Sequence, residues 1–447
     1  MTRRITELKR GNVRRNLIGS LLGLAVLGVV ACEEQTPTSL DDSLLPQEPI
    51  TVELRIPWED FASNLEVIGG FGVPMELGTG VIAKSFGGTL DARTLLRFAD
   101  YPTQAQVRDT TGTTRTDDSL TFIGGRLLAF LDTMASTNEG PVLLSLGAIQ
   151  HEWDVRTVTW TTAVDTINDQ RSWPEAGAGP VAPVSTAEWD PATGDSVWFE
   201  LDSAQVAAWA DTSDPSRGAR IELLTEGERI QIAGAVLRLN IRPSLNPDTT
   251  IVESVQRRDI SFVYNPSPEP PLDGVRVGGA PAWRTVLDVR IPGELNGPEA
   301  LCAVVTCPVK LHASELNYAA LVFRSRRTEA AFQPTDTVGI DVRPVLSRDA
   351  LPKAPLGASM LGLAGRLLGP EVFGEQAGQD IEIPITVFAR NLITGTTDGG
   401  LEPPGTVALL SLLEPVSIAF ASFHGPGSED APFLKLIVTI GRSVELP

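Results

Sequence analysis

Short runs of alternating apolar and polar residues recur from about residue 51 to the end of the chain. Residues 51–57 (TVELRIP) alternate cleanly, as in a strand that buries one face. Similar runs, separated by Gly, Pro, Asp, Asn and Ser, occupy residues 121–131, 142–149, 157–160, 197–201, 221–224, 230–241 and 260–264. Many short strands separated by turns predict an all-β fold of the sandwich or jelly-roll type.

Helical patterns are few. Residues 203–210 (SAQVAAWA) can form two turns after an N-capping serine. Residues 356–368 have a helical composition but contain three glycines. Neither pattern changes the prediction of an all-β protein.

One stretch of the pattern occurs twice. Residues 93–98 (RTLLRF) return as residues 284–289 (RTVLDV), each after a glycine pair and before a proline. Downstream, residues 221–233 resemble 407–419, and residues 236–241 resemble 433–438. The second copy carries the extra residues 420–430, which contain Gly-Pro-Gly and are predicted to form a loop. We infer two copies of one β-domain.

The boundary between the copies is predicted at residues 265–271 (NPSPEPP), a stiff spacer that cannot donate to a sheet ladder. The sequence therefore predicts two tandem jelly-roll-like β-sandwich domains, residues 51–265 and residues 266–447. Residues 259–264 can either close the first domain or open the second.

The amino-terminal segment has the layout of an export signal. Basic residues precede an apolar run at residues 17–30, which is too short to span a bilayer comfortably as a helix. The run ends Val-Val-Ala before Cys32, which resembles the bacterial lipoprotein signal. The resemblance implies a signal peptide at residues 1–31 and acylation of Cys32. Glu33, rather than Asp, follows the cysteine, and its resemblance to the proteobacterial sorting pattern implies the outer membrane. An uncleaved membrane anchor is the alternative.

Residues 32–50 are polar, acidic and proline-containing, which predicts a flexible tether. The formal net charge of the chain is -20, and removing the basic signal segment makes the remainder more negative. Such a surface repels nucleic acid and anionic lipid headgroups, so both are poor partners, and no nucleic-acid binding is predicted.

The two cysteines outside the signal region, Cys302 and Cys307, lie close enough in sequence to close a small loop. In an oxidising compartment they predict a disulfide. Two free thiols are the alternative, and a metal site that includes His312 lacks further ligands of the expected spacing.

Several sequence motifs of the first half follow one another in an order that is found in a known protein family. A glycine-rich approach leads to the strand at residues 93–98, and Trp153 and a Val-Thr-Trp element ending at Trp160 come next. The apolar segment 197–209 and a closing strand at residues 236–241 follow. This arrangement resembles the DNRLRE-domain family, and residues 272–440 resemble it more faintly, without the Val-Thr-Trp element. The resemblance implies secreted or surface β-sandwich modules, some of which are grouped with carbohydrate-binding modules.

Six of the eight tryptophans lie within residues 151–209. Trp160, Trp198 and Trp209 fall in strand-like or amphipathic runs and are predicted to pack in the core. Trp173 and Trp189 fall in a segment rich in Pro and Gly, where a buried aromatic side chain is less expected. They are the predicted glycan contacts, because sugar rings stack on indole faces.

Catalytic patterns are sparse. The three histidines stand far apart, and no metal-ligand spacing or Gly-x-Ser-x-Gly motif is present. His424 with Glu429 and Asp430 is a small acid/base cluster that we interpret as a solvated loop. A structural Ca²⁺ in the acidic loop between Asp190 and Asp195 is left open. No other metal site, cofactor or enzymatic activity is predicted.

These features predict a lipid-anchored protein of the outer membrane or surface of a bacterium. Its non-catalytic modules are expected to bind or organise extracellular material, with glycan as the favoured ligand. A structural or adhesion protein that contacts other proteins is the first alternative. A carboxylate-dependent glycan hydrolase or lyase is the second.

Overall fold

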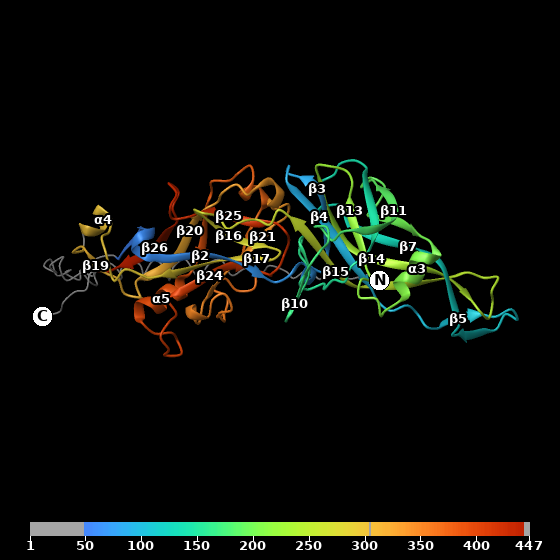
Figure 1. The fold of residues 1–447 in the computed structure, drawn as a ribbon. Helices are drawn as coiled ribbons and strands as arrows, with labels where there is room; N and C mark the ends of the chain where they lie inside the picture. The colour runs from blue at the N-terminus through green and yellow to red at the C-terminus, as the bar shows by residue number, and fades with distance from the viewer. Residues whose placement is uncertain (1–48, 304, 442–447) are drawn as a thin grey trace, which may run out of the picture. The chain divides into compact units, whose positions relative to one another are not determined.

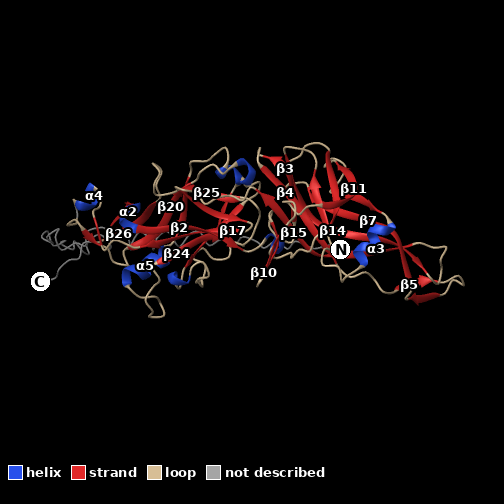
Figure 2. Cartoon of the chain, in the orientation of Figure 1, coloured by secondary structure: helices blue, strands red, loops and turns tan. Residues whose placement is uncertain are grey.

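The computed structural model describes residues 49–303 and 305–441 (Figure 1). Strands dominate this part of the chain, and the helices are short (Figure 2). The predicted all-β fold is therefore confirmed. Residues Ile50–Ile440 form one compact unit. The predicted signal peptide, Cys32 and nearly all of the predicted tether lie outside the described residues.

The first sandwich consists of residues 80–265. Its strands form one continuous sheet with the order β11-β8-β13-β4-β15-β14-β7-β12, and β3 pairs with both β14 and β4. The strands from β11 to β15 form one layer, and β15 continues into the second layer with β14, β7 and β12. The strands are β3 (Gly80–Phe86), β4 (Leu90–Phe98), β7 (Leu120–Asp132), β8 (Val142–Ile149), β11 (Val181–Trp189), β12 (Ser196–Leu201), β13 (Ala219–Leu223), β14 (Glu228–Pro243) and β15 (Ile251–Asn265). Inward-facing residues such as Leu96, Leu127, Phe199 and Leu237 form its core.

Smaller elements decorate this sandwich. Two hairpins are formed by β5 (Ala105–Arg108) with β6 (Thr114–Asp117) and by β9 (Thr162–Thr166) with β10 (Asp169–Ser172). The predicted short helix is confirmed as α3 (Ser203–Ala210). Its N-cap is Asp202, whose carboxylate accepts a hydrogen bond from the backbone N–H of Gln205.

A second sandwich, called the composite sandwich, combines residues 50–71 with residues 274–440. One layer has the order β22-β21-β24-β17-β16-β25, with β2 beside β17, and the other has the order β1-β26-β20-β23. The strands are β1 (Ile50–Pro57), β2 (Ala62–Phe71), β16 (Gly274–Gly279), β17 (Ala282–Val289), β20 (Leu316–Arg324), β21 (Val338–Pro344), β22 (Arg366–Leu368), β23 (Asp380–Pro384), β24 (Thr406–Ser411), β25 (Phe420–His424) and β26 (Phe433–Ile440).

The remaining elements of the described chain are short. They are β18 (Glu294–Leu295), β19 (Val309–Lys310), α2 (Trp58–Phe61), α4 (Glu299–Cys302), α5 (Thr386–Thr394), η2 (Pro74–Leu77), η3 (Ala330–Phe332), η4 (Arg348–Ala350) and η5 (Pro370–Phe373). Residues 356–368 form no helix and end in β22. The longest helix outside the first sandwich, α5, is one that the sequence pattern did not predict.

The predicted start of the first domain at residue 51 is wrong. β1 pairs along its whole length with β26, and β2 pairs with β17, so both belong to the composite sandwich. In Figure 1 the blue β2 lies among the yellow and orange strands of that sandwich. Alternation identified residues 51–57 as a strand correctly, but it carries no information about which strand will be the partner. The first sandwich is therefore inserted after β2.

The pairing scheme nevertheless repeats, which supports the inferred duplication. β4 and β17, the two Arg-Thr strands, each form a glycine hairpin with the preceding strand and, farther along the same edge, pair with β13 or β24. In the first sandwich β15 pairs with β14 and then with β4. In the composite sandwich, β1 pairs with β26 as β15 pairs with β14, and β2 pairs with β17 as β15 pairs with β4. Residues 259–264 therefore close the first sandwich.

The extra residues 420–430 of the second copy are not simply a loop. Residues Phe420–His424 form β25, which pairs with β16. In the first sandwich the long strand β14 pairs first with β3 and then with β7. In the composite sandwich two strands make the equivalent pairings, because β25 pairs with β16 and β26 pairs with β20. A loop prediction based on Gly-Pro-Gly is correct only after His424.

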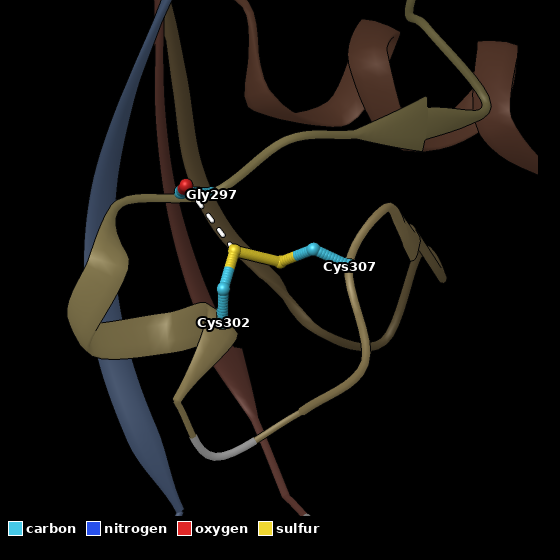
Figure 3. Close-up of a disulfide and its surroundings, with 3 residues drawn as sticks. All are labelled: Gly297, Cys302 and Cys307. Atoms are coloured by element: carbon cyan, nitrogen blue, oxygen red, sulfur yellow. Dashed lines mark hydrogen bonds between the residues drawn. A yellow bond between two sulfur atoms is a disulfide. The ribbon is translucent and has the colours of Figure 1, made fainter.

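The predicted disulfide between Cys302 and Cys307 is confirmed (Figure 3). Cys302 ends α4, and the two Cα atoms lie 5.4 Å apart. The Cys302 sulfur lies 3.4 Å from the carbonyl oxygen of Gly297. A disulfide sulfur has no hydrogen to donate, so this approach is a packing contact.

Candidate functional site

Both tryptophans predicted to contact glycan are buried. Trp173 is 5% exposed and Trp189 is 1% exposed. The indole N–H of Trp173 donates to the carbonyl of Thr159, and that of Trp189 donates to the carbonyl of Gly194. Neither side chain offers an open face to a sugar ring. The prediction that Trp173 and Trp189 contact glycan is therefore wrong.

The burial has a structural cause. The segment between β8 and β11 folds over the outer side of the β8-β13-β4-β15 layer and builds a second small core there, which includes Trp173. Trp189 is the last residue of β11 and belongs to the main core. A segment rich in Pro and Gly can therefore bury aromatic side chains when it covers a sheet.

Trp198, predicted to be a core residue, is instead the exposed tryptophan. It is 38% exposed, and it lies on β12 between the buried Val197 and Phe199. Side chains alternate between the two faces of a strand, so Trp198 shares its face with the exposed Glu200. This two-residue period, readable in VWFEL, is the signal that identifies Trp198 as outward-facing.

A second exposed aromatic side chain lies diagonally across the sheet. Trp198 stands opposite Leu128 of β7, and Phe130 follows two residues along the same strand and stands opposite Ser196. Phe130 is also 38% exposed. Diagonal neighbours on one sheet face are about 7–8 Å apart, within reach of aromatic side chains. The two rings therefore share one open surface.

Two arginines from the neighbouring strands β7 and β14 lie near the Trp198 ring. The guanidinium carbon of Arg238 on β14 lies 5.0 Å from the centroid of the Trp198 ring, and that of Arg126 on β7 lies 6.0 Å from it. Arg126 also forms a 2.8 Å ion pair with Glu200. The surface made by Arg126, Phe130, Trp198, Glu200 and Arg238 is called the Trp198 face.

The Trp198 face carries an unbalanced positive charge. Arg126 and Arg238 stand directly opposite each other on adjacent strands, an arrangement that destabilises a sheet. Glu200 compensates one of the two arginines. The face therefore offers aromatic rings and guanidinium donors on a chain whose net charge is -20. Such a combination can stack a ring and bind an anionic group beside it.

The other predicted polar sites are held by local interactions. His424 Nε2 lies 4.0 Å from Asp430, which also lies 3.3 Å from Arg324. Asp190 accepts a hydrogen bond from the backbone N–H of Ala192 within its own turn. In the part of the chain that the structure describes, no group of three or more His, Cys, Asp or Glu side chains is placed to hold a metal ion.

Asp117 is another acidic residue whose carboxylate is held by hydrogen bonds within the fold. The backbone N–H of Leu245 donates to it, as do that of Ser119 and the hydroxyl of Ser244. These hydrogen bonds, that from Leu245 first, hold the pKa of Asp117 below its ordinary value. The carboxylate joins the turn before β7 to the end of β14, which is a structural role.

Comparison with known proteins yields little. No family model matches the chain, and no curated protein matches it. Among solved structures, the naturally occurring empty top component of Cowpea mosaic virus is similar at 13% identity over 82% of this chain and 89% of that chain, with a TM-score of 0.12. A likeness this weak supports no argument. None of the helices in the described residues is long and apolar enough to cross a membrane.

Proposed function

We propose that this protein is an exported, lipid-anchored bacterial surface protein that binds extracellular glycan through the Trp198 face. The observation that carries the proposal is the exposure of Trp198 beside Phe130 and near two arginines. Indole and phenyl faces stack against the apolar C–H face of a pyranose, and both rings are large rigid anchors. Membership in the DNRLRE-domain family, proposed from motif order, agrees with this function.

The charge of the face favours an acidic glycan. A carboxylate or sulfate on a sugar can accept hydrogen bonds from Arg238, which has no carboxylate partner among the described side chains. The strongly negative remainder of the chain repels polyanions that approach elsewhere. An acidic polysaccharide is therefore expected to bind at this face and weakly at other surfaces.

The anchor and the binding face belong to different sandwiches in this proposal. Cys32 is the proposed lipid attachment, at the outer membrane or cell surface, and the tether continues into β1. Because β1 is part of the composite sandwich, the tether enters that sandwich. The Trp198 face lies on the first sandwich, which the tether does not enter.

Affinity electrophoresis of the full chain in gels that contain polygalacturonate, alginate or xylan tests this function. Migration of the wild type should be retarded by at least one acidic polymer, and Trp198→Ala should restore free migration. Leu143→Ala is the matched control, because Leu143 is 41% exposed on β8 and lies outside the Trp198 face. Equal retardation of the Trp198→Ala variant, or none for the wild type across the panel, would overturn the proposal.

A protein partner is the second candidate for the same face. Exposed aromatic residues and arginines are also the side chains that concentrate at protein–protein hot spots. Capture of a specific surface protein by the wild type, lost in Trp198→Ala, without retention on any glycan, would favour this structural or adhesion role.

A further inference from the structure

A cavity apart from the Trp198 face contains an unusual cation. The cavity has a volume of ≈ 210 Å³ and lies within the compact unit Ile50–Ile440. Its lining includes Arg229 and Gln231 of β14, together with Thr335, Thr337 and Ser417. A cavity of about 150 Å³ is enough for a benzene-sized molecule. The space is therefore large enough for a small organic ligand.

Arg229 is buried and forms no ion pair with a described residue. It is 5% exposed, and its guanidinium carbon lies 5.1 Å from the centroid of the Phe86 ring. Nη2 donates to Thr335 Oγ1 at 3.1 Å, whereas Nη1 is buried and has no described acceptor. Burial lowers the pKa of Arg229 to about 10. Burying a charge without a partner is costly, so a guanidinium held this way is poised to gain from an anion.

The two carboxylates that line the same cavity, Asp132 and Asp336, accept hydrogen bonds from nearby backbone N–H groups. Asp132 accepts hydrogen bonds from the backbone N–H groups of Met134 and Ala135. Asp336 accepts one from the backbone N–H of Thr337. Neither forms an ion pair with Arg229 in the described structure. Their charges also make the cavity less favourable for a ligand that carries two negative charges.

We propose that this cavity binds a small organic monocarboxylate, with Arg229 and Thr335 as its polar contacts. A carboxylate matches the planar fork of a guanidinium and accepts two hydrogen bonds at once. Thr335 Oγ1 accepts from Arg229, so its own O–H remains to donate to the ligand. The surrounding apolar atoms, such as those of Val416 and Ile418, suit a short hydrocarbon or ring. This site is independent of the proposed glycan contact.

Isothermal titration of the full chain with sodium benzoate and sodium acetate, against sodium chloride at equal ionic strength, tests the proposal. Both carboxylates should bind the wild type, and Arg229→Met should weaken binding at least about tenfold, the equivalent of losing one charge-assisted contact. Arg108→Met removes an exposed arginine of β5 that lies outside both the cavity and the Trp198 face, and this variant should bind both carboxylates as the wild type does.

A second variant keeps the test decisive if Arg229→Met does not fold. Thr335→Val replaces the hydroxyl of an exposed residue with a methyl group of similar size and should weaken benzoate binding about fivefold. Failure of both carboxylates to bind the wild type, or unchanged binding in both variants, would overturn the site. Tighter binding of sodium sulfate than of acetate would overturn the assignment to a monocarboxylate.

Discussion

Leu54 of β1 stands directly opposite Leu436 of β26, so the first described strand of the chain pairs with the last. Both side chains are buried, at 6% and 0% exposure, in the core of the composite sandwich. The composite sandwich is therefore complete only when both ends of the described chain are present. The first sandwich needs neither of these strands.

Truncating Leu54 should destabilise one sandwich selectively. Leu54→Ala removes a buried side chain and is expected to cost about 2–5 kcal/mol of the stability of the composite sandwich. Hydrogen exchange should show faster exchange of the amides in β26, with little change in β4 of the first sandwich. Val52→Ala, at a partly buried position of the same strand, should have a smaller effect. Equal acceleration in β4 and β26 would contradict the strand assignment.

Trp198 and Trp189 should respond differently to truncation. Trp189→Ala empties a fully buried site and is expected to cost about 3–5 kcal/mol of unfolding free energy. Trp198→Ala removes a side chain from an open sheet face and should cost about 1 kcal/mol or less. Denaturant unfolding of the two variants beside the wild type measures both values. A larger loss for Trp198→Ala than for Trp189→Ala would show that the exposed ring is chiefly structural.

Local patterns in the sequence were sufficient to predict strands but not their partners. The alternation at residues 51–57 predicted β1, and the repeated Arg-Thr segment predicted two equivalent strands, β4 and β17. Pairing of β1 with β26 depends on contacts between the two ends of the chain, which no local period encodes. The tandem boundary was therefore wrong, although the inferred duplication agrees with the repeated pairing scheme.

The candidate site was missed for a different reason. A tryptophan in a strand was assigned to the core by its hydrophobicity, although Glu200, two residues after Trp198, shows which face points outward. Trp173 was assigned to the surface from its loop-like surroundings, although such a segment can cover a sheet. Phe130 and Arg238 join the face only through the register of β7 with β12 and β14, which the sequence does not show.

The disulfide should contribute modest stability, because the loop it closes is short. Replacing Cys302 and Cys307 together with serine is expected to cost about 2 kcal/mol of unfolding free energy on the chain-entropy view. The adjacent Leu301 is buried in the composite core, so the loss should be confined to that sandwich. Unfolding with and without a reductant should give the same difference for the wild type. A reductant effect that persists in the double variant would contradict this source of stability.

The composite sandwich also contains a hydrogen-bonded polar network that predicts its pH dependence. Glu382 on β23 accepts from Lys435 Nζ and from the Tyr318 hydroxyl, each at 2.9 Å. The bond from Lys435 is the largest cause that holds the pKa of Glu382 below its ordinary 4.5. Burial first, and the bond to Glu382 second, raise the pKa of Tyr318 from 10.0 to about 12.

These two shifts act at opposite ends of the pH scale. Glu382 has a lowered pKa, so its stabilisation is present above pH 4.5 and is lost as the pH falls through its folded pKa. Tyr318 has a raised pKa, so its contribution is complete below pH 10.0 and is lost as the pH rises to about 12. Denaturant unfolding across pH should show that Glu382→Gln flattens the acid limb and Tyr318→Phe the alkaline limb, each relative to the wild type. If Tyr318→Phe leaves the alkaline limb unchanged, the other tyrosines of the chain control it and this network does not.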